Sequence, residues 1–400
     1  MKQIIEYNYL TRQQFLNATE NPLDPANVQN AALIAHETPH FIDHISTLSG
    51  QKLLLDIFNA YSAVDNRDKK QYWRVIKLQQ VLKNTKYEEH YKEYGQNYSI
   101  TSKGHDGWTF RSSFGARLDV EGKEDLNFPI IFNNYKYRGQ FVGKIPLSLE
   151  SLWETNAVAS EIDLHVASII LMEDKDQAAI STQLIQNHYK DWLYDPKMLT
   201  YSIAAQLVSS LLGYGDIHTA FMISKSLSSI ALNLPKTCYK NIKIPKDSGV
   251  PEDRIENLTN SDDPSCMFYL MVLNVKEAKE DILASNGYVD VEKVLRINGF
   301  PEKEILEREI KKEMEFQKSE ALDGPNKEVY LYFYNLGVKL FEKIGIDSAP
   351  YTLAYAKFAK STLNICCEEC LDDSNEIVIR DSAFDFLLAE INNVIENYGN

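Results

Sequence analysis

Apolar residues first recur at helical spacing just after the pair Asp24-Pro25. Aspartate is a favoured helix cap and proline suits the first helical position, so this pair predicts a helix start. Val28, Ala31 and Ala35 then follow at intervals of three and four residues, which is typical of the buried face of a helix.

The pattern changes between residues 97 and 146. Short alternating or β-branched runs are separated there by Gly, Asn and Asp, and such runs predict a small, mostly antiparallel sheet. The five runs are NYSITS, GWTFRSS, ARLDV, FPIIFNN and QFVGKI.

Helical periodicity dominates before this sheet and returns after Pro146. The predicted helices are Gln51–Val64, Lys69–Tyr94, Ser148–Met172, Gln177–Leu193, Pro196–Leu212 and Asp216–Leu232. Residues 233–264 are rich in proline and charge, which predicts a linker or surface excursion. From residue 265 the pattern is helical again. The prediction is a mainly α protein with a small antiparallel β-sheet (α+β), divided into domains at 1–232 and 265–400.

Composition narrows the function. The chain has 400 residues, a net charge of −15 and a sequence pI near 5.1. Nucleic acid is a poor partner for such an acidic chain, because phosphates bind basic surfaces. The sequence has no apolar run of membrane-spanning length and no signal-peptide pattern at its start, and its five cysteines are scattered. We expect a cytoplasmic protein without nucleic-acid or membrane partners, and the oligomeric state stays open.

The stretch AHETPHFIDH, residues 35–44, contains the spacing HExxH. In a helix, His36 and His40 lie one turn apart on the same face, so both imidazoles reach one ion. Glu37 then lies beside the ion. Zinc lowers the pKa of bound water to about 7, and a nearby carboxylate takes the proton as the water attacks a carbonyl.

Pro39 interrupts this stretch. A proline inside a helix removes one hydrogen bond and crowds the carbonyl four residues earlier, here that of Ala35. One possibility is a continuous helix that keeps His36 and His40 together. The other is a helix that stops and restarts at Thr38, which would favour His40 and His44 as the pair.

The predicted helix 148–172 supplies a third ligand. At about 100° per residue, Glu154, Glu161 and His165 share one face with apolar residues. Buried carboxylates need a metal or a charged partner. The expected solvent face of this helix carries three polar residues and a small one: Asn156, Ser160, Asp163 and Ala167.

Two structural roles compete with metal binding on these helices. Ser151 and Glu154 match the capping-box spacing, so Glu154 could instead cap the helix. Glu161 and His165 could form an internal pair or support the metal ligands. Asp43 and His44 extend the histidine stripe and are predicted to support the ligands rather than bind the ion.

HExxH followed, after a sheet-bearing insertion, by a helix with ExxA resembles the gluzincin group of zinc metallopeptidases. The resemblance covers these two helices. It implies a zincin-like domain at 1–232, with His36, His40 and Glu154 as Zn²⁺ ligands and Glu37 as general base. Val158 stands where many gluzincins have an acidic residue, and Glu161 could take that role.

The function predicted from this resemblance is a zinc-dependent hydrolase acting on a peptide or protein. Two alternatives stay open. One is a dinuclear carboxylate–histidine metalloenzyme, in which a second set of residues, Glu154, Glu161 and His165, joins His36, Glu37 and His40. The other is a non-catalytic helical interaction protein with a decayed or structural metal site.

Overall fold

The computed structural model describes residues 10–87, 91–95, 107–119, 121–245 and 248–355. In this part of the chain, a small antiparallel sheet accompanies many helices, which confirms the predicted mainly α class with a small β-sheet. The helices are α1 (Arg12–Glu20), α2 (Val28–Ser46), α3 (Leu48–Asp65), η1 (Lys69–Gln71), α4 (Trp73–Thr85), α5 (Leu149–Ile170), α6 (Lys175–Leu193), η3 (Pro196–Met198), α7 (Leu199–Leu212), α8 (Ile217–Asn233), α9 (Lys236–Asn241), α10 (Glu252–Asn260), α11 (Pro264–Ala278), α12 (Val291–Asn298), α13 (Lys303–Ser319), α14 (Pro325–Ile344) and η4 (Ala349–Ala354). The strands are β1 (Glu93–Tyr94), β2 (Trp108–Leu118), β3 (Glu124–Tyr137) and β4 (Gln140–Leu147).

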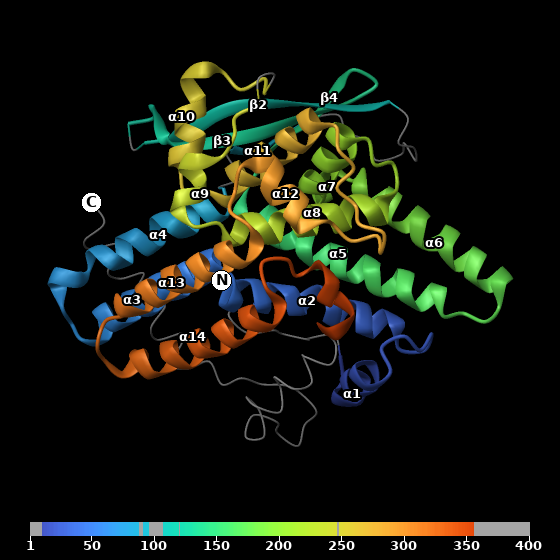
Figure 1. Ribbon diagram of the computed structural model, residues 1–400, viewed down its shortest axis with the longest axis horizontal. Helices are drawn as coiled ribbons and strands as arrows, with labels where there is room; N and C mark the ends of the chain where they lie inside the picture. Colours follow the sequence, from blue (N-terminus) through green and yellow to red (C-terminus); the bar gives the residue numbers. More distant parts are fainter. Residues whose placement is uncertain (1–9, 88–90, 96–106, 120, 246–247, 356–400) are drawn as a thin grey trace.

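The four strands pair in the order β1-β4-β3-β2, and every pair is antiparallel. The sheet forms one side of the molecule, at the top of Figure 1, where α10 packs on β3 and α7 on β4. Four of the five predicted runs fall in β2, β3 and β4, while the run NYSITS lies outside the described residues. The sheet therefore packs against α7 and α10.

Helix α5 runs through the middle of the molecule, with α2 on one side and α7 and α8 on the other (Figure 1). It begins at Leu149 because Ser148 caps it and exchanges capping-box hydrogen bonds with Ser151. This start leaves Glu154 inside the helix, so the predicted capping role of Glu154 is wrong. The side chain of Glu154 is free to act elsewhere.

The expected solvent face of α5 is also wrong. Asn156 and Ser160 are fully buried, and Asp163 is 8% exposed. They are buried because α2, α8 and η4 supply hydrogen-bond partners for polar groups that would otherwise need water. One buried side of α5 thus carries polar residues. A prediction from the spacing of polar and apolar residues assigns such a side to solvent.

Helix α2 begins at Val28 with Asn27 as its N-cap, three residues later than predicted. The carboxylate of Asp24 instead accepts a hydrogen bond from the amide of Ala26, at 2.8 Å, in a turn before the helix. The helix then continues unbroken to Ser46, through Pro39. This continuity rules out the restart at Thr38 and keeps the HExxH register.

Residues 233–264 form two short helices, α9 and α10, and contribute buried side chains to the largest apolar core. The buried residues of this segment in that core are Leu234, Cys238, Tyr239, Ile242, Val250 and Leu258. The linker interpretation is therefore corrected to a packed segment. The same core draws on both 48–232 and 265–346, and the division into domains stays a prediction.

The predicted helix Lys69–Tyr94 is shorter, since α4 ends at Thr85 and β1 occupies residues 93–94. Helix α14 lies against the end of α2, where a side chain at Gly337 would collide with the carbonyl of Ile45.

Within the described residues, no helix combines the length and apolar character that a membrane crossing needs.

Candidate metal centre

The two histidines of the HExxH stretch face α5 from α2. Their rings lie 5.5 Å apart between centroids and are nearly perpendicular, at 74°. The Nε2 atoms of His36 and His40 lie 3.8 and 3.5 Å from Oε2 of Glu154. Two helices far apart in sequence thus bring three potential ligands to one point.

The distances suit one small ion. Zinc–ligand bonds of about 2.0–2.1 Å at tetrahedral angles place two ligand atoms about 3.3–3.4 Å apart. One nitrogen from each histidine and one carboxylate oxygen of Glu154 all lie within 4.8 Å of one another. A movement of a few tenths of an ångström in the side chains brings both His–Glu distances to the ideal value.

Oε2 of Glu154 is the atom that most needs a partner. It is buried, and it forms no hydrogen bond with any described residue. An anionic oxygen buried without a partner is costly, and a cation between it and the two imidazoles would offset that cost. The side chains of His36, His40 and Glu154 are still 17–23% exposed, so an ion can reach them. The donor set therefore fits a metal ion.

Glu161 contacts Nδ1 of His36, the ring nitrogen on the other side from the Nε2 that faces Glu154. Its Oε2 lies 3.1 Å from Nδ1 of His36, and its Oε1 accepts a hydrogen bond from the hydroxyl of Tyr189 at 2.9 Å. With Nδ1–H donating to Glu161, the lone pair of Nε2 points to Glu154 and the ion position. This is the arrangement by which carboxylates orient metal-binding histidines.

The same contacts shift the pKa values of His36 and Glu161. Burial acts to lower the pKa of His36, but the hydrogen bond that His36 makes to Glu161 and the charges of Glu161, Glu154 and Glu37 outweigh burial and raise it. Burial likewise acts to raise the pKa of Glu161, and the hydrogen bond with His36 keeps that pKa lowered. Both shifts show that Glu161 and His36 stabilise each other's charged forms, and that the carboxylates around His36 favour positive charge at this centre.

Glu37 follows His36 on α2, and its charge acts on both His36 and Tyr201. The charge of Glu154, followed by burial and the charges of Glu150 and Glu37, raises the pKa of Tyr201 to about 12. A tyrosine with this pKa stays protonated and can donate a hydrogen bond. A potential base and a potential donor thus lie at the same centre.

The remaining predicted residues lie further out. Asp43 accepts a hydrogen bond from Asn156 at 2.7 Å, and burial raises its pKa to about 6. His44 contacts the carbonyl of His40 and the ring of Trp153, 4.2 Å away, and burial lowers its pKa to about 4. His165 is buried behind Glu161, with its ring 6.4 Å from that of Tyr189. Of the supporting residues predicted, Glu161 is the one whose side chain contacts a ligand imidazole.

Sequence reasoning missed Tyr189 and Tyr201. Each lies on a helix without a motif, α6 and α7, and each reaches the centre only after these helices fold onto α5. The chain has 23 tyrosines, so residue type alone does not single them out. Helical spacing does place Tyr189 on the same face as Leu193, which packs on α5, and that is a weak signal.

Comparison of the sequence and the structure with known proteins finds no matching family, no similar characterised protein and no similar solved structure. The geometry of this centre is therefore the basis on which a function can be inferred.

Proposed function

We propose that this protein is a zinc-dependent hydrolase that cleaves peptide bonds. His36, His40 and Glu154 would hold the ion, and Glu37 would act as general base. The observation that carries the proposal is the buried, unpartnered Oε2 of Glu154, which lies within 3.8 Å of both imidazole Nε2 atoms. Three protein ligands are the usual set of a catalytic zinc site that keeps one position open.

When bound, zinc would supply Lewis acidity and lower the pKa of a coordinated water to about 7. Side chains of the protein supply the general base, the hydrogen-bond donor and the orientation of a ligand. Glu37 takes a proton from the attacking water, and the hydroxyl of Tyr201 donates to the oxygen on which negative charge develops. Glu161 keeps the proton of His36 on Nδ1, so Nε2 remains a ligand.

One ion per chain is favoured over two. A dinuclear site would need Glu161 and His165 to face the same space as Glu154. Instead, both oxygens of Glu161 have partners, in His36 and Tyr189. The proposal keeps a zincin-like arrangement of α2 and α5, a peptide or protein substrate and the cytoplasm as location.

Metal content is the first test. We expect about one zinc per chain in purified protein and essentially none in the His36→Ala/His40→Ala double variant. A His218→Ala variant is the control, because His218 lies on α8 and contacts Asp163 rather than the ligands. Full zinc occupancy in the double variant would refute the ligand assignment.

Peptide cleavage is the second test. General bases contribute about 10²–10⁴-fold, so Glu37→Gln should keep its zinc and lose activity by that factor. Cleavage would be measured on a mixed peptide library, with chelator-treated wild type as the zinc-free control. Wild-type activity in Glu37→Gln would show that Glu37 is not the base.

A further inference from the structure

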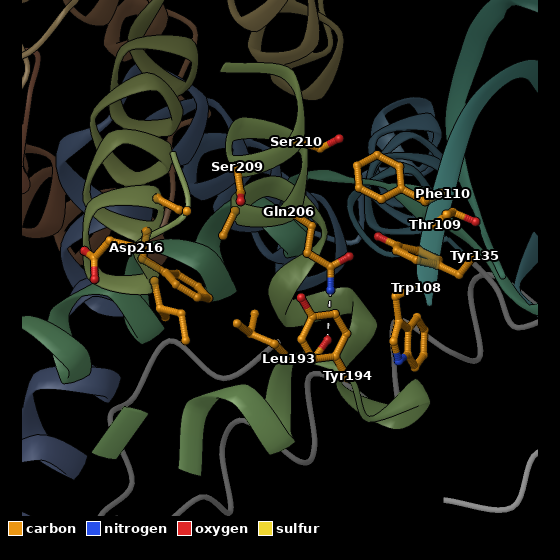
Figure 2. Close-up of a pocket in the computed structure, with 15 residues that line it drawn as sticks. Trp108, Thr109, Phe110, Tyr135, Leu193, Tyr194, Gln206, Ser209, Ser210 and Asp216 are labelled. Atoms are coloured by element: carbon orange, nitrogen blue, oxygen red, sulfur yellow. Dashed lines mark hydrogen bonds between the residues drawn. The ribbon is translucent and has the colours of Figure 1, made fainter. Parts of the chain in front are cut away.

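A cavity of about 380 Å³ opens between the sheet and the helices α6, α7 and α8 (Figure 2). This volume is in the range of small-ligand sites. The start of β2, the end of α6, the middle of α7 and the start of α8 supply its walls. None of the residues that line the cavity takes part in the proposed metal centre, so the metal centre does not account for the cavity.

Aromatic rings line the side of the cavity formed by the sheet. The rings of Trp108 and Tyr194 lie 5.4 Å apart, and those of Phe110 and Tyr135 lie 5.6 Å apart. Figure 2 shows Trp108, Phe110 and Tyr135 together on one side of the space. Aromatic rings favour contact with another ring, stacked or edge-on. This wall therefore suits a flat, apolar group.

Gln206 is the polar group at the middle of the cavity. Its amide nitrogen donates to the carbonyl of Leu193 at 2.8 Å and to the hydroxyl of Ser202 at 3.0 Å, which fixes the orientation of the amide. Its oxygen then points toward the side of Trp108 and Tyr135 (Figure 2). The cavity thus combines an aromatic wall with one oriented acceptor.

Helices α6 and α7 connect this cavity to the metal centre. On α7, Tyr201, whose carbonyl lies 3.5 Å from the hydroxyl of Thr155 next to Glu154, is followed one turn later by Ala205 in the cavity wall. On α6, Tyr189, which holds Glu161, is followed one turn later by Leu193 in the wall. One helical turn is about 5.4 Å.

Helix α5 makes the same connection independently. Val158 lies one turn after Glu154 and belongs to the apolar cluster that contains Leu193, Ala205 and Phe221 of the cavity wall. On all three helices, the residues that form or adjoin the cavity wall thus begin one turn after residues of the metal centre. Consecutive residues of an extended peptide advance by about 3.3–3.6 Å.

We propose that this cavity binds an aromatic side chain of the substrate, tyrosine or tryptophan, next to the peptide bond that is cleaved. The proposal rests on the proposed peptidase function for the neighbouring bond, and on the cavity itself for the choice of side chain. The ring packs on Trp108 and its neighbours, and its O–H or N–H donates to the oxygen of Gln206. Phenylalanine fits the wall but leaves that acceptor unpaired.

The first experiment measures binding without catalysis. N-acetyl-tyrosinamide, N-acetyl-phenylalaninamide and N-acetyl-alaninamide are titrated into wild-type protein, with tryptophan fluorescence and calorimetry as readouts. We expect saturable binding of the tyrosine amide, roughly tenfold weaker binding of the phenylalanine amide, as one lost buried hydrogen bond implies, and none of the alanine amide. Equal binding of all three, or binding of none, would overturn the proposal.

Two variants locate the binding. Ser209→Phe, on the half-buried rim of the cavity, should abolish binding of the tyrosine amide while zinc content stays unchanged. Gln206→Leu should remove the preference for tyrosine over phenylalanine. Ala179→Phe, on the exposed side of α6, is the matched control and should bind like wild type. Unchanged binding in Ser209→Phe would place the ligand elsewhere and refute the assignment.

A peptide library separates this proposal from the peptidase. We expect cleavage next to tyrosine and tryptophan, with this preference lost in Ser209→Phe. Cleavage without aromatic preference, together with no binding of the amides, would overturn the aromatic site and leave the peptidase intact. Binding of the tyrosine amide without cleavage of any peptide would overturn the peptidase and leave an aromatic-binding site.

Discussion

Helix α5 carries polar side chains on both sides of its contact with α2, and the two sets are held in different ways. On one side, Glu154 and Glu161 face the histidines of α2. On the other, Asn156, Ser160 and Asp163 face α8, η4 and the end of α2. Both sets are largely buried, yet only the first has a charged atom without a partner.

The second set is organised by Lys225, which is fully buried. Its ammonium donates to the hydroxyl of Ser160 at 2.6 Å and lies 4.6 Å from the centre of the Tyr355 ring. Burial lowers the pKa of Lys225 to about 8, and the charges of Asp43, Asp163 and Asp347 oppose that shift. We call these four charged residues the Lys225 cluster.

Each carboxylate of the Lys225 cluster has its own hydrogen bonds. Asp163 accepts from Thr352 and contacts His218 at 3.0 Å, and Asp347 accepts from Ser226 at 3.0 Å. Asp43 accepts from Asn156. The three carboxylates of this network thus have hydrogen-bond partners, and its buried atom without one, Oδ1 of Asn156, is neutral, whereas the buried atom without one in the metal centre, Oε2 of Glu154, belongs to a carboxylate. Hydrogen bonding of the charged groups, rather than burial or charge alone, distinguishes this structural polar cluster from the proposed binding site.

The largest expected effect separates the two clusters through stability. Removing one partner of a buried charge network costs about 3–5 kcal/mol. We therefore expect Lys225→Met to lower the free energy of unfolding by that amount and to leave the zinc content of the folded protein unchanged. Denaturant unfolding measures the first and metal analysis the second. Exposed Lys175→Met is the control, expected within about 0.5 kcal/mol of wild type. A Lys225→Met variant as stable as wild type would show that Lys225 does not stabilise the fold.

Glu154→Gln should show the opposite behaviour. Loss of an anionic ligand should weaken zinc binding by more than the 10–100-fold typical of supporting residues. The zinc-free variant should be at least as stable as zinc-free wild type, because the amide removes a buried negative charge whose Oε2 accepts no hydrogen bond. Competition with a chromophoric chelator gives the affinity. A stability loss like that of Lys225→Met in the absence of zinc would mean that Glu154 is structural.

Acid should act on the Lys225 cluster through Asp163. Burial acts to raise its pKa, but hydrogen bonds with His218 and Thr352 hold that pKa below its usual range. A lowered carboxyl pKa stabilises the fold above the unfolded value, about 3.9, and this contribution disappears as pH falls through the folded pKa. Asp163→Asn should therefore be about 1.5–3 kcal/mol less stable at pH 7, with the gap closing below pH 4. A gap that stays constant from pH 7 to pH 3 would contradict this assignment.

Glu161→Gln should have a smaller effect, confined to the metal centre. The amide keeps the shape of the side chain but weakens the hold on Nδ1 of His36, so zinc affinity should fall about 10–100-fold. Glu173→Gln, an exposed carboxylate just beyond α5, is the matched control. Zinc affinity equal to wild type would show that Glu161 does not orient His36.

Local signals predicted much of this architecture. Ser148 marks the start of α5, the HExxH spacing brings His36 and His40 together, and alternation marks the strands. These features depend on residues within a few positions of one another. Sequence periodicity also placed Glu154 and Glu161 on one face of α5, as observed.

The errors share a different cause. The side of α5 that carries Ser160 looks like a solvent face until Lys225, 65 residues later, supplies a buried partner. Tyr189 and Tyr201 reach the metal centre by helix packing, which leaves no motif. Residues 233–264 look like a linker because their apolar residues are sparse, yet those residues are buried. Contacts distant in sequence decide all three cases.

The smallest expected effect on zinc concerns Pro39, within the continuous helix α2. Proline removes the hydrogen bond to the carbonyl of Ala35, so Pro39→Ala should raise the free energy of unfolding, by up to about 3 kcal/mol. Zinc affinity should stay at the wild-type value, because His36 and His40 already share one face of an unbroken helix. The control is Pro264→Ala, since Pro264 opens α11 and removes no internal hydrogen bond there. Denaturant unfolding measures the free energy of unfolding, and chelator competition measures the zinc affinity.

A large loss of zinc affinity in a well-folded Pro39→Ala protein would show that proline itself shapes the ligand geometry. The HExxH register would then be necessary for the metal centre but not sufficient.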